Sequence, residues 1–170
     1  RGNHTEPYNS YGNGSAMRVS PVAWYANSLD ECEALAAATA EVTHSRPEGI
    51  KGAVAVAGAI YLARTKHSIA EIKEYIYSFY KIDFTLDEIR DTYGFYETCQ
   101  ESVPQALEAF FESVSFEDAI RNAISIGGDS DTIACMAGAV AAAFFGIPKD
   151  IREAAQPFLE GEVKRVYQAF

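Results

Sequence analysis

The sequence predicts an all-α protein, and three observations support that prediction. Helix-capping patterns, in which Ser or Thr precedes an acidic residue by three positions, occur at Ser28, Ser68 and Thr85. Apolar residues recur at three- and four-residue spacing along most of the chain, which is the period of one helix face. No alternating run of apolar and polar residues reaches the length of a strand. We therefore expect one all-α domain over residues 1–170.

The first half of the chain contains a loop and several helices. Residues 1–14 are rich in Gly, Asn, Ser, Tyr and Pro, which indicates a loop, and a helix is expected to begin at Ser15. Small residues in the segment Glu48–Arg64 allow a neighbouring backbone to approach closely. The helices expected here cover residues 29–43, 48–64, 69–80 and 86 to about 94.

The second half continues the helical pattern. Ser102-Val103-Pro104 is expected to open a helix that ends near Phe111, because proline is tolerated in the first turn. Another helix over Ser115–Ser125 ends at two glycines, and the uncharged run Ile133–Ile147 forms the next. That run is shorter than the roughly 20 residues needed to span a bilayer. One or two terminal helices are expected over Pro148–Leu159 and Glu162–Phe170.

Composition excludes some classes of partner. The formal net charge is -10 and no basic stripe is present, so we expect neither nucleic-acid binding nor attachment to an anionic membrane. The three cysteines, Cys32, Cys99 and Cys135, lack the spacing of a metal site. Cys32 and Cys135 fall in apolar helical segments and are predicted to be buried thiols. This pattern is typical of a reducing compartment, so we expect a cytoplasmic protein.

The segment Gly127–Thr132 has the most informative local chemistry. Asp129, Asp131 and Thr132 place two carboxylates and a hydroxyl at the start of an uncharged helix. Such oxygen donors suit a hard cation such as Mg²⁺. The alternative is that the aspartates only cap the helix, which explains one carboxylate well. Two neighbouring carboxylates repel unless a cation or a proton compensates, so both interpretations stay open from local chemistry.

Two other segments are candidates for ligand contact. Gly12, Asn13 and Gly14 precede a predicted helix start, where free N–H groups suit a phosphate. The alternative is an ordinary Asn-Gly turn. His44 ends an alanine-rich helix and is either a helix-end or surface residue or, if it faces the aspartates, part of the same cleft.

Taken in order, these motifs resemble those of one family, the ADP-ribosylglycohydrolases. The run from Gly12 to Arg18 (GNGSAMR) resembles the family's glycine-rich segment, and Thr43-His44 resembles its Thr-His pair. The run from Gly127 to Thr132 (GGDSDT) resembles its C-terminal metal motif. The similarity extends from about Tyr8 to Pro148.

The resemblance implies a fold, a site and a reaction. The fold would be an orthogonal all-α bundle with a cleft that holds two Mg²⁺ ions, or Mn²⁺ in some members. The reaction would be hydrolysis of the bond between C1″ of ADP-ribose and a modified side chain or a small acceptor. Asp129, Asp131 and Thr132 would be metal ligands, with the two aspartates also catalytic and Asp131 bridging the ions. The implied substrate-binding residues are Gly12, Asn13, Gly14, Ser15, Met17 and His44.

The sequence also departs from the family pattern. The family has an upstream Thr-Asp-Asp metal motif, and none precedes Gly12 here. The chain thus resembles the C-terminal two-thirds of a family member, and a separate chain could supply the remaining ligands. We expect the 170-residue chain alone to bind Mg²⁺ weakly and to turn over slowly. The alternative function is a non-catalytic ADP-ribose-binding protein or complementing subunit.

Overall fold

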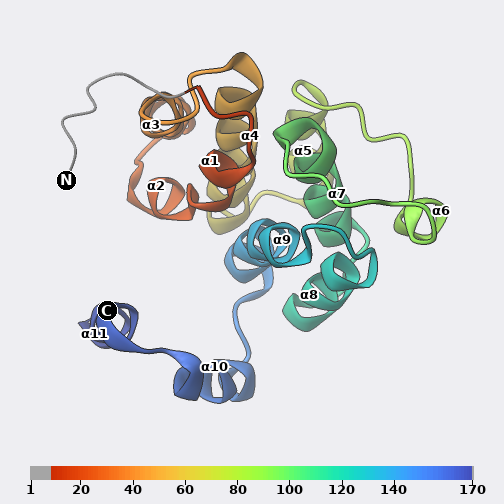
Figure 1. Ribbon diagram of the computed structural model, residues 1–170. Coiled ribbons are helices and arrows are strands. Elements are labelled where there is room, and N and C mark those ends of the chain that lie inside the picture. The colour runs from red at the N-terminus through yellow and green to blue at the C-terminus, as the bar shows by residue number, and fades with distance from the viewer. Residues whose placement is uncertain (1–8, 170) are drawn as a thin grey trace.

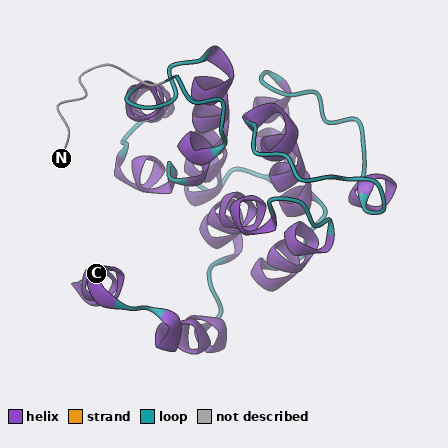
Figure 2. Cartoon of the chain, viewed as in Figure 1, coloured by secondary structure: helices purple, strands orange, loops and turns teal. Residues whose placement is uncertain are grey.

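The computed structural model describes residues 9–169, and this part of the chain is helical (Figure 2). It contains no strand, and its β-type pairing is a single isolated bridge between Gly12 and Thr98. The all-α prediction is confirmed. Most of the loop predicted over residues 1–14 lies outside the described residues; the part that is described has no helix before Gly14.

Eleven α-helices and one 3₁₀ turn follow one another in the described chain (Figure 1). Their bounds are α1 Gly14–Met17, α2 Ser20–Tyr25, α3 Leu29–Glu41, α4 Pro47–Arg64, α5 Ile69–Tyr77, α6 Leu86–Ile89, α7 Cys99–Phe111, α8 Phe116–Ser125, α9 Ser130–Phe145, α10 Lys149–Ala155, η1 Gln156–Phe158 and α11 Gly161–Ala169.

The capping patterns act as the sequence predicts. Ser68 and Thr85 each form a complete capping box with the glutamate three residues later. The Ser28 hydroxyl accepts from the backbone N–H of Glu31 at 3.1 Å. The Glu31 carboxylate accepts instead from the backbone N–H of Asn27 at 2.7 Å, one residue before the cap. Each of the three helices therefore begins where its cap predicts.

Some helix bounds differ from the prediction. Helix α2 was not expected; its start is favoured by Pro21 at the second position, but it spans less than two turns and lacks a clear apolar period. Helix α6 ends at Ile89 rather than near Gly94. Helix α7 begins at Cys99, so Pro104 lies inside it rather than in the first turn. Pro104 has no backbone N–H, so the carbonyl of Gln100 lacks its intrahelical hydrogen bond. Gln100 is exposed, so water can replace that bond.

The buried core centres on α4 and α9. Helix α3 packs on α4, helices α7 and α8 pack on α9, and α4 contacts α9 directly. In Figure 1, α4 runs along the plane of the view while α9 is seen nearly end-on, so the two helices cross steeply. Helix α4 can approach its neighbours closely because small buried residues line it, among them Gly52, Ala53 and Ala57.

Helices α10 and α11 differ from the rest of the chain. They follow Gly146 and lie apart from the body of α1–α9 (Figure 1), and no described residue in either helix or in η1 is buried. Phe158, Val163 and Val166 are exposed there. The expectation of one domain over 1–170 therefore stays a prediction. Within residues 9–169, no helix combines the length and the apolar character needed to cross a membrane.

Candidate functional site

The glycine-rich segment is fixed to the loop that precedes α7. The backbone N–H of Asn13 donates to the Glu97 carbonyl at 2.7 Å, and Gly12 forms the isolated bridge with Thr98. The backbone N–H of Gly12 donates to the Ser10 hydroxyl at 3.1 Å. These bonds hold the turn in one conformation before any ligand is present.

Buried contacts support the same segment from beneath. The Ser15 hydroxyl donates to the carbonyl of Gly49 in α4 at 2.8 Å. The Cys99 thiol, at the start of α7, lies 3.6 Å from the Gly12 carbonyl and donates to it. Burial raises the pKa of Cys99 to about 11, so the thiol stays protonated as this contact requires. Helix α1 begins at Gly14, one residue before the predicted start, and is a single turn.

The Asn13 side chain joins the glycine-rich segment to the aspartate motif. Its Nδ2 donates to Asp129 Oδ2 at 2.7 Å, although the two residues are 116 positions apart in the sequence. The same nitrogen donates to the Ser102 hydroxyl at 3.1 Å. Both amide hydrogens of Asn13 are thus committed inside the protein, and Oδ1 is the atom left to meet a ligand.

Two glycines form the turn that leads into α9 and positions the aspartates. Gly127 and Gly128 have φ of +72° and +68°, a region that residues with a side chain rarely adopt. A Cβ on Gly128 would also lie 2.6 Å from the Tyr93 ring and 2.7 Å from the Gly94 carbonyl. The close approach of the loop around residue 93 therefore requires glycine at position 128.

The aspartates are not occupied in capping α9. Asp129 stands at the N-cap position, but its side chain makes no capping hydrogen bond and accepts from Asn13 instead. Asp131 is exposed and has no hydrogen bond or ion pair within residues 9–169. Asp129 therefore does not cap α9 through a side-chain hydrogen bond, whereas Asp131 lies in the first turn, where a carboxylate favours the helix dipole.

Thr132 and Met17 meet each other at the same place. Thr132 is buried, and its hydroxyl donates to the Met17 sulfur at 3.6 Å. A thioether is a weak acceptor, so a stronger acceptor oxygen could displace it at little cost, and the lone pairs of the hydroxyl could face a cation. Met17 lies on α1 and is partly exposed beside the aspartate motif.

The donor set fits part of a cation site. Asp129, Asp131 and Thr132 provide oxygen atoms, which Mg²⁺ prefers. Within residues 9–169, no group of three or more His, Cys, Asp and Glu side chains gathers closely enough to hold a metal. Mg²⁺ takes about six ligands, so the described residues supply at most a portion of its shell.

His44 faces the glycine-rich segment and is not the surface residue of the alternative interpretation. It is buried, its Nδ1 lies 2.7 Å from the Thr43 hydroxyl, and a Cβ placed on Gly14 would lie 3.4 Å from its Nε2. Burial lowers the pKa of His44, and the nearby charge of Arg18 lowers it further. The neutral imidazole is therefore favoured at this position.

A hollow of about 460 Å³ opens at this segment. Of the predicted residues, Gly12, Asn13, Gly14 and His44 line it, whereas Ser15, Met17, Asp129, Asp131 and Thr132 do not. The remaining lining residues, which sequence reasoning missed, are Ser10, Tyr11, Glu97 and Thr98. Tyr11 adjoins the glycines and could have been suspected, and the Arg46 guanidinium lies 3.6 Å from the centre of its ring. Glu97 and Thr98 are distant in sequence and gave no signal.

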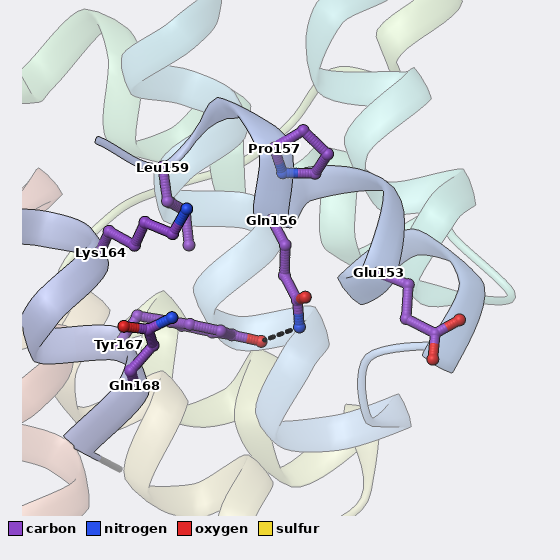
Figure 3. A pocket seen from close by; sticks show the side chains of 7 residues that line it. All are labelled: Glu153, Gln156, Pro157, Leu159, Lys164, Tyr167 and Gln168. Atoms are coloured by element: carbon purple, nitrogen blue, oxygen red, sulfur yellow. Dashed lines mark hydrogen bonds between the residues drawn. The ribbon is translucent and has the colours of Figure 1, made fainter.

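A second hollow of about 480 Å³ lies between α10, η1 and α11 (Figure 3). Gln156 Nε2 donates to the Tyr167 hydroxyl there at 3.4 Å. None of the predicted site residues lines this hollow. It therefore has no connection with the chemistry that the sequence predicts.

The cysteine prediction is partly wrong. Cys32 is buried as expected, but Cys135 is exposed. Residues four apart lie on one face of a helix, so Cys135 shares the exposed face of α9 with Asp131. The apolar run around Cys135 suggests burial because the other faces of α9 are buried.

Comparison with known proteins identifies relatives of the chain. The family model described as ADP-ribosylglycohydrolase matches residues 1–170. The protein named ADP-ribosylhydrolase ARH3 is 28% identical in Mus musculus and in Homo sapiens, over 91% of this chain and 55% and 56% of those proteins. An uncharacterised protein of Archaeoglobus fulgidus is 31% identical over 91% of this chain and 57% of its own length.

A solved structure shares the fold. Its title is "ADP-ribosylglycohydrolase-related protein complex", and it matches with a TM-score of 0.69 at 22% identity. The match covers 85% of this chain and 54% of that chain. The chain therefore spans about half the length of the curated relatives and of the solved structure that it matches.

Proposed function

Because this chain belongs to the ADP-ribosylglycohydrolase family, we propose that it carries part of a hydrolase site for ADP-ribose. The bond cleaved would be the N- or O-glycosidic bond between ADP-ribose and a modified protein side chain or a small acceptor. One observation supports this most strongly. The hydrogen bond from Asn13 to Asp129 brings the glycine-rich segment and the aspartate motif to one place.

On the nucleotide side, the proposed contacts come from the hollow at the glycine-rich segment. Gly12, Asn13 and Gly14 would lie against the diphosphate or the neighbouring ribose, and glycine lets the ligand approach the backbone closely. His44 would form the adjoining wall, where burial favours its neutral ring. Ser15 and Met17 would support the segment and the aspartate motif.

On the acidic side, we propose that Asp129, Asp131 and Thr132 hold Mg²⁺, with Mn²⁺ as a substitute. A two-ion centre would take its further ligands from outside the described residues. A divalent cation bound there would supply positive charge that orients water and substrate hydroxyls near the reacting carbon. The role of Asp131 is to offer carboxylate oxygens that no other described side chain engages.

Release of ADP-ribose from an ADP-ribosylated peptide tests the proposal directly. We expect the chain alone to release ADP-ribose slowly and only with Mg²⁺ present. Addition of a chelator should stop this release. Asp131→Asn should abolish the release while the far-UV circular dichroism stays unchanged, because Asp131 has no partner within residues 9–169 whose loss would disturb the fold. Turnover that is unaffected by Asp131→Asn would overturn the assignment.

A second candidate function is binding of ADP-ribose without hydrolysis. It is favoured by the small number of metal-type side chains that gather within residues 9–169. ADP-ribose affinity that is retained at saturating Mg²⁺, with no release of product from any acceptor, would select this function over the hydrolase.

A further inference from the structure

We infer that Ser102 is a positioning residue of this site, which fixes the Asn13 amide and through it the Asp129 carboxylate. The effect of Ser102 on catalysis rests on the proposed function, whereas its effect on the position of Asn13 is a property of the chain itself. No motif pointed to Ser102, which the sequence suggested only as a helix start. In the structure it lies inside α7, one turn beyond Thr98.

The hydrogen bonds of Ser102 allow only one arrangement of polarity. Its side chain is fully buried, and its hydroxyl donates to the Thr98 carbonyl at 2.6 Å. A hydroxyl has one proton, so only its lone pairs face Asn13. They accept from Asn13 Nδ2 at 3.1 Å. If the amide were flipped, its oxygen would face the lone pairs of Ser102 and the carboxylate of Asp129, and both contacts would repel.

The second amide hydrogen of Asn13 then reaches Asp129. Nδ2 lies 2.7 Å from Oδ2, which holds one oxygen of this carboxylate at a fixed place. The other oxygen, Oδ1, has no hydrogen bond within residues 9–169. The order Thr98, Ser102, Asn13, Asp129 thus orients a carboxylate whose remaining oxygen is available to a cation. Partners of this kind, one step behind a ligand, change metal affinity by about 10–100-fold when removed.

The segment that follows α7 supplies a control. Ser113, just after the last turn of α7, is also buried, and its hydroxyl donates to the Phe110 carbonyl at 2.6 Å. Like Ser102 it donates to a nearby backbone carbonyl, but among the described residues it has no bond to the site. Both alanine variants lose a buried bond to a backbone carbonyl, and Ser102→Ala also loses the bond from Asn13. If only the carbonyl bond mattered, both variants would give the same outcome.

The experiment compares Ser102→Ala, Ser102→Thr and Ser113→Ala in the full chain. The first readout is hydrogen exchange of the Asn13 side-chain NH₂ by NMR without ligand. We expect faster exchange in Ser102→Ala, wild-type exchange in Ser113→Ala, and at least partial recovery in Ser102→Thr, which keeps the hydroxyl. Exchange that is equal in the two alanine variants would overturn the inference.

The second readout is the affinity for Mn²⁺, followed by electron paramagnetic resonance. We expect it to fall about 10–100-fold in Ser102→Ala and to change less than about twofold in Ser113→Ala. Equal losses in both variants would contradict the positioning role. If the wild-type chain bound neither Mn²⁺ nor ADP-ribose, the proposed function would fail, and the NMR exchange would still decide whether Ser102 fixes Asn13.

Discussion

The glycine-rich segment and the aspartate motif form the two sides of the proposed site, and their polar groups differ in how they are bonded. Around Asn13, the backbone and the side chain are bonded to Glu97, Ser102 and Asp129. At the start of α9, Asp131 has no partner within residues 9–169. The first side is formed before a ligand arrives. The second holds negative charge that becomes favourable only when a cation compensates it.

The largest expected effect is on the side that lacks partners. Asp131→Asn should lower the affinity for Mn²⁺ by about 100-fold or more, since a direct ligand matters at least as much as the residues behind it. The melting temperature should stay within about 1 °C, because exposed substitutions change stability little.

Asp150→Asn is a suitable control for that experiment. Asp150 is also an exposed aspartate in the first turn of a helix, but in α10 rather than α9. It should leave the Mn²⁺ affinity unchanged. Equal losses in the two variants would indicate that Mn²⁺ responds to net charge and not to a site at Asp131.

Thiol labelling compares the two sides without a mutation. Cys99 is buried beneath the glycine-rich segment, whereas Cys135 is exposed beside Asp131. Iodoacetamide should modify Cys135 in the native chain. Cys99 should react at least about tenfold more slowly, because reaching it requires local opening. Peptide mass spectrometry identifies the modified residue, and early labelling of Cys99 would show that this side is not preformed.

Gly52→Ala should weaken the preformed side by overpacking it. The added Cβ would lie 2.6 Å from the Cys99 sulfur and 2.9 Å from its Cβ. We expect the free energy of unfolding to fall by about 1–3 kcal/mol, measured by urea denaturation. Cys99→Ala removes the sulfur, so the cost of Gly52→Ala should be smaller in that background. Strictly additive effects would contradict the contact.

The smallest expected effect is a pH dependence from His44. Its pKa is lowered in the folded chain, so the unfolded chain binds a proton more readily. This contribution to stability is complete above the unfolded pKa of about 6.5 and is lost as the pH falls through the folded pKa. Between pH 7.5 and 5, His44→Gln should lose less stability than wild type in thermal denaturation. A slope that is identical in both proteins would show that His44 does not contribute.

The sequence predicted much of the fold. Of the candidate site it predicted the glycine-rich segment, His44 and the aspartate motif, but not the contacts that join them. The caps at Ser28, Ser68 and Thr85 are local signals, and the helices begin where they indicate. The bond between Asn13 and Asp129 is not local, since it depends on how α4, α7 and α9 pack. For the same reason Ser102, Glu97 and Thr98 went unnoticed.

Exposure on a buried helix was equally hard to predict. Cys135 lies in an apolar run that suggests burial on all sides, but packing leaves one strip of α9 in contact with solvent. The strip begins at Asp131 and becomes visible only when the neighbouring helices are placed. A sequence pattern gives the period of a helix, and tertiary contacts decide which face is covered.

An NMR titration of the ¹⁵N-labelled chain with ADP-ribose and Mg²⁺ tests the central claim most directly. If the two sides form one site, amide shifts should appear together at Gly12–Ser15, His44 and Asp129–Thr132 and saturate at the same ligand concentration. Shifts confined to the hollow between α10 and α11, or two sets that saturate independently, would contradict a single site.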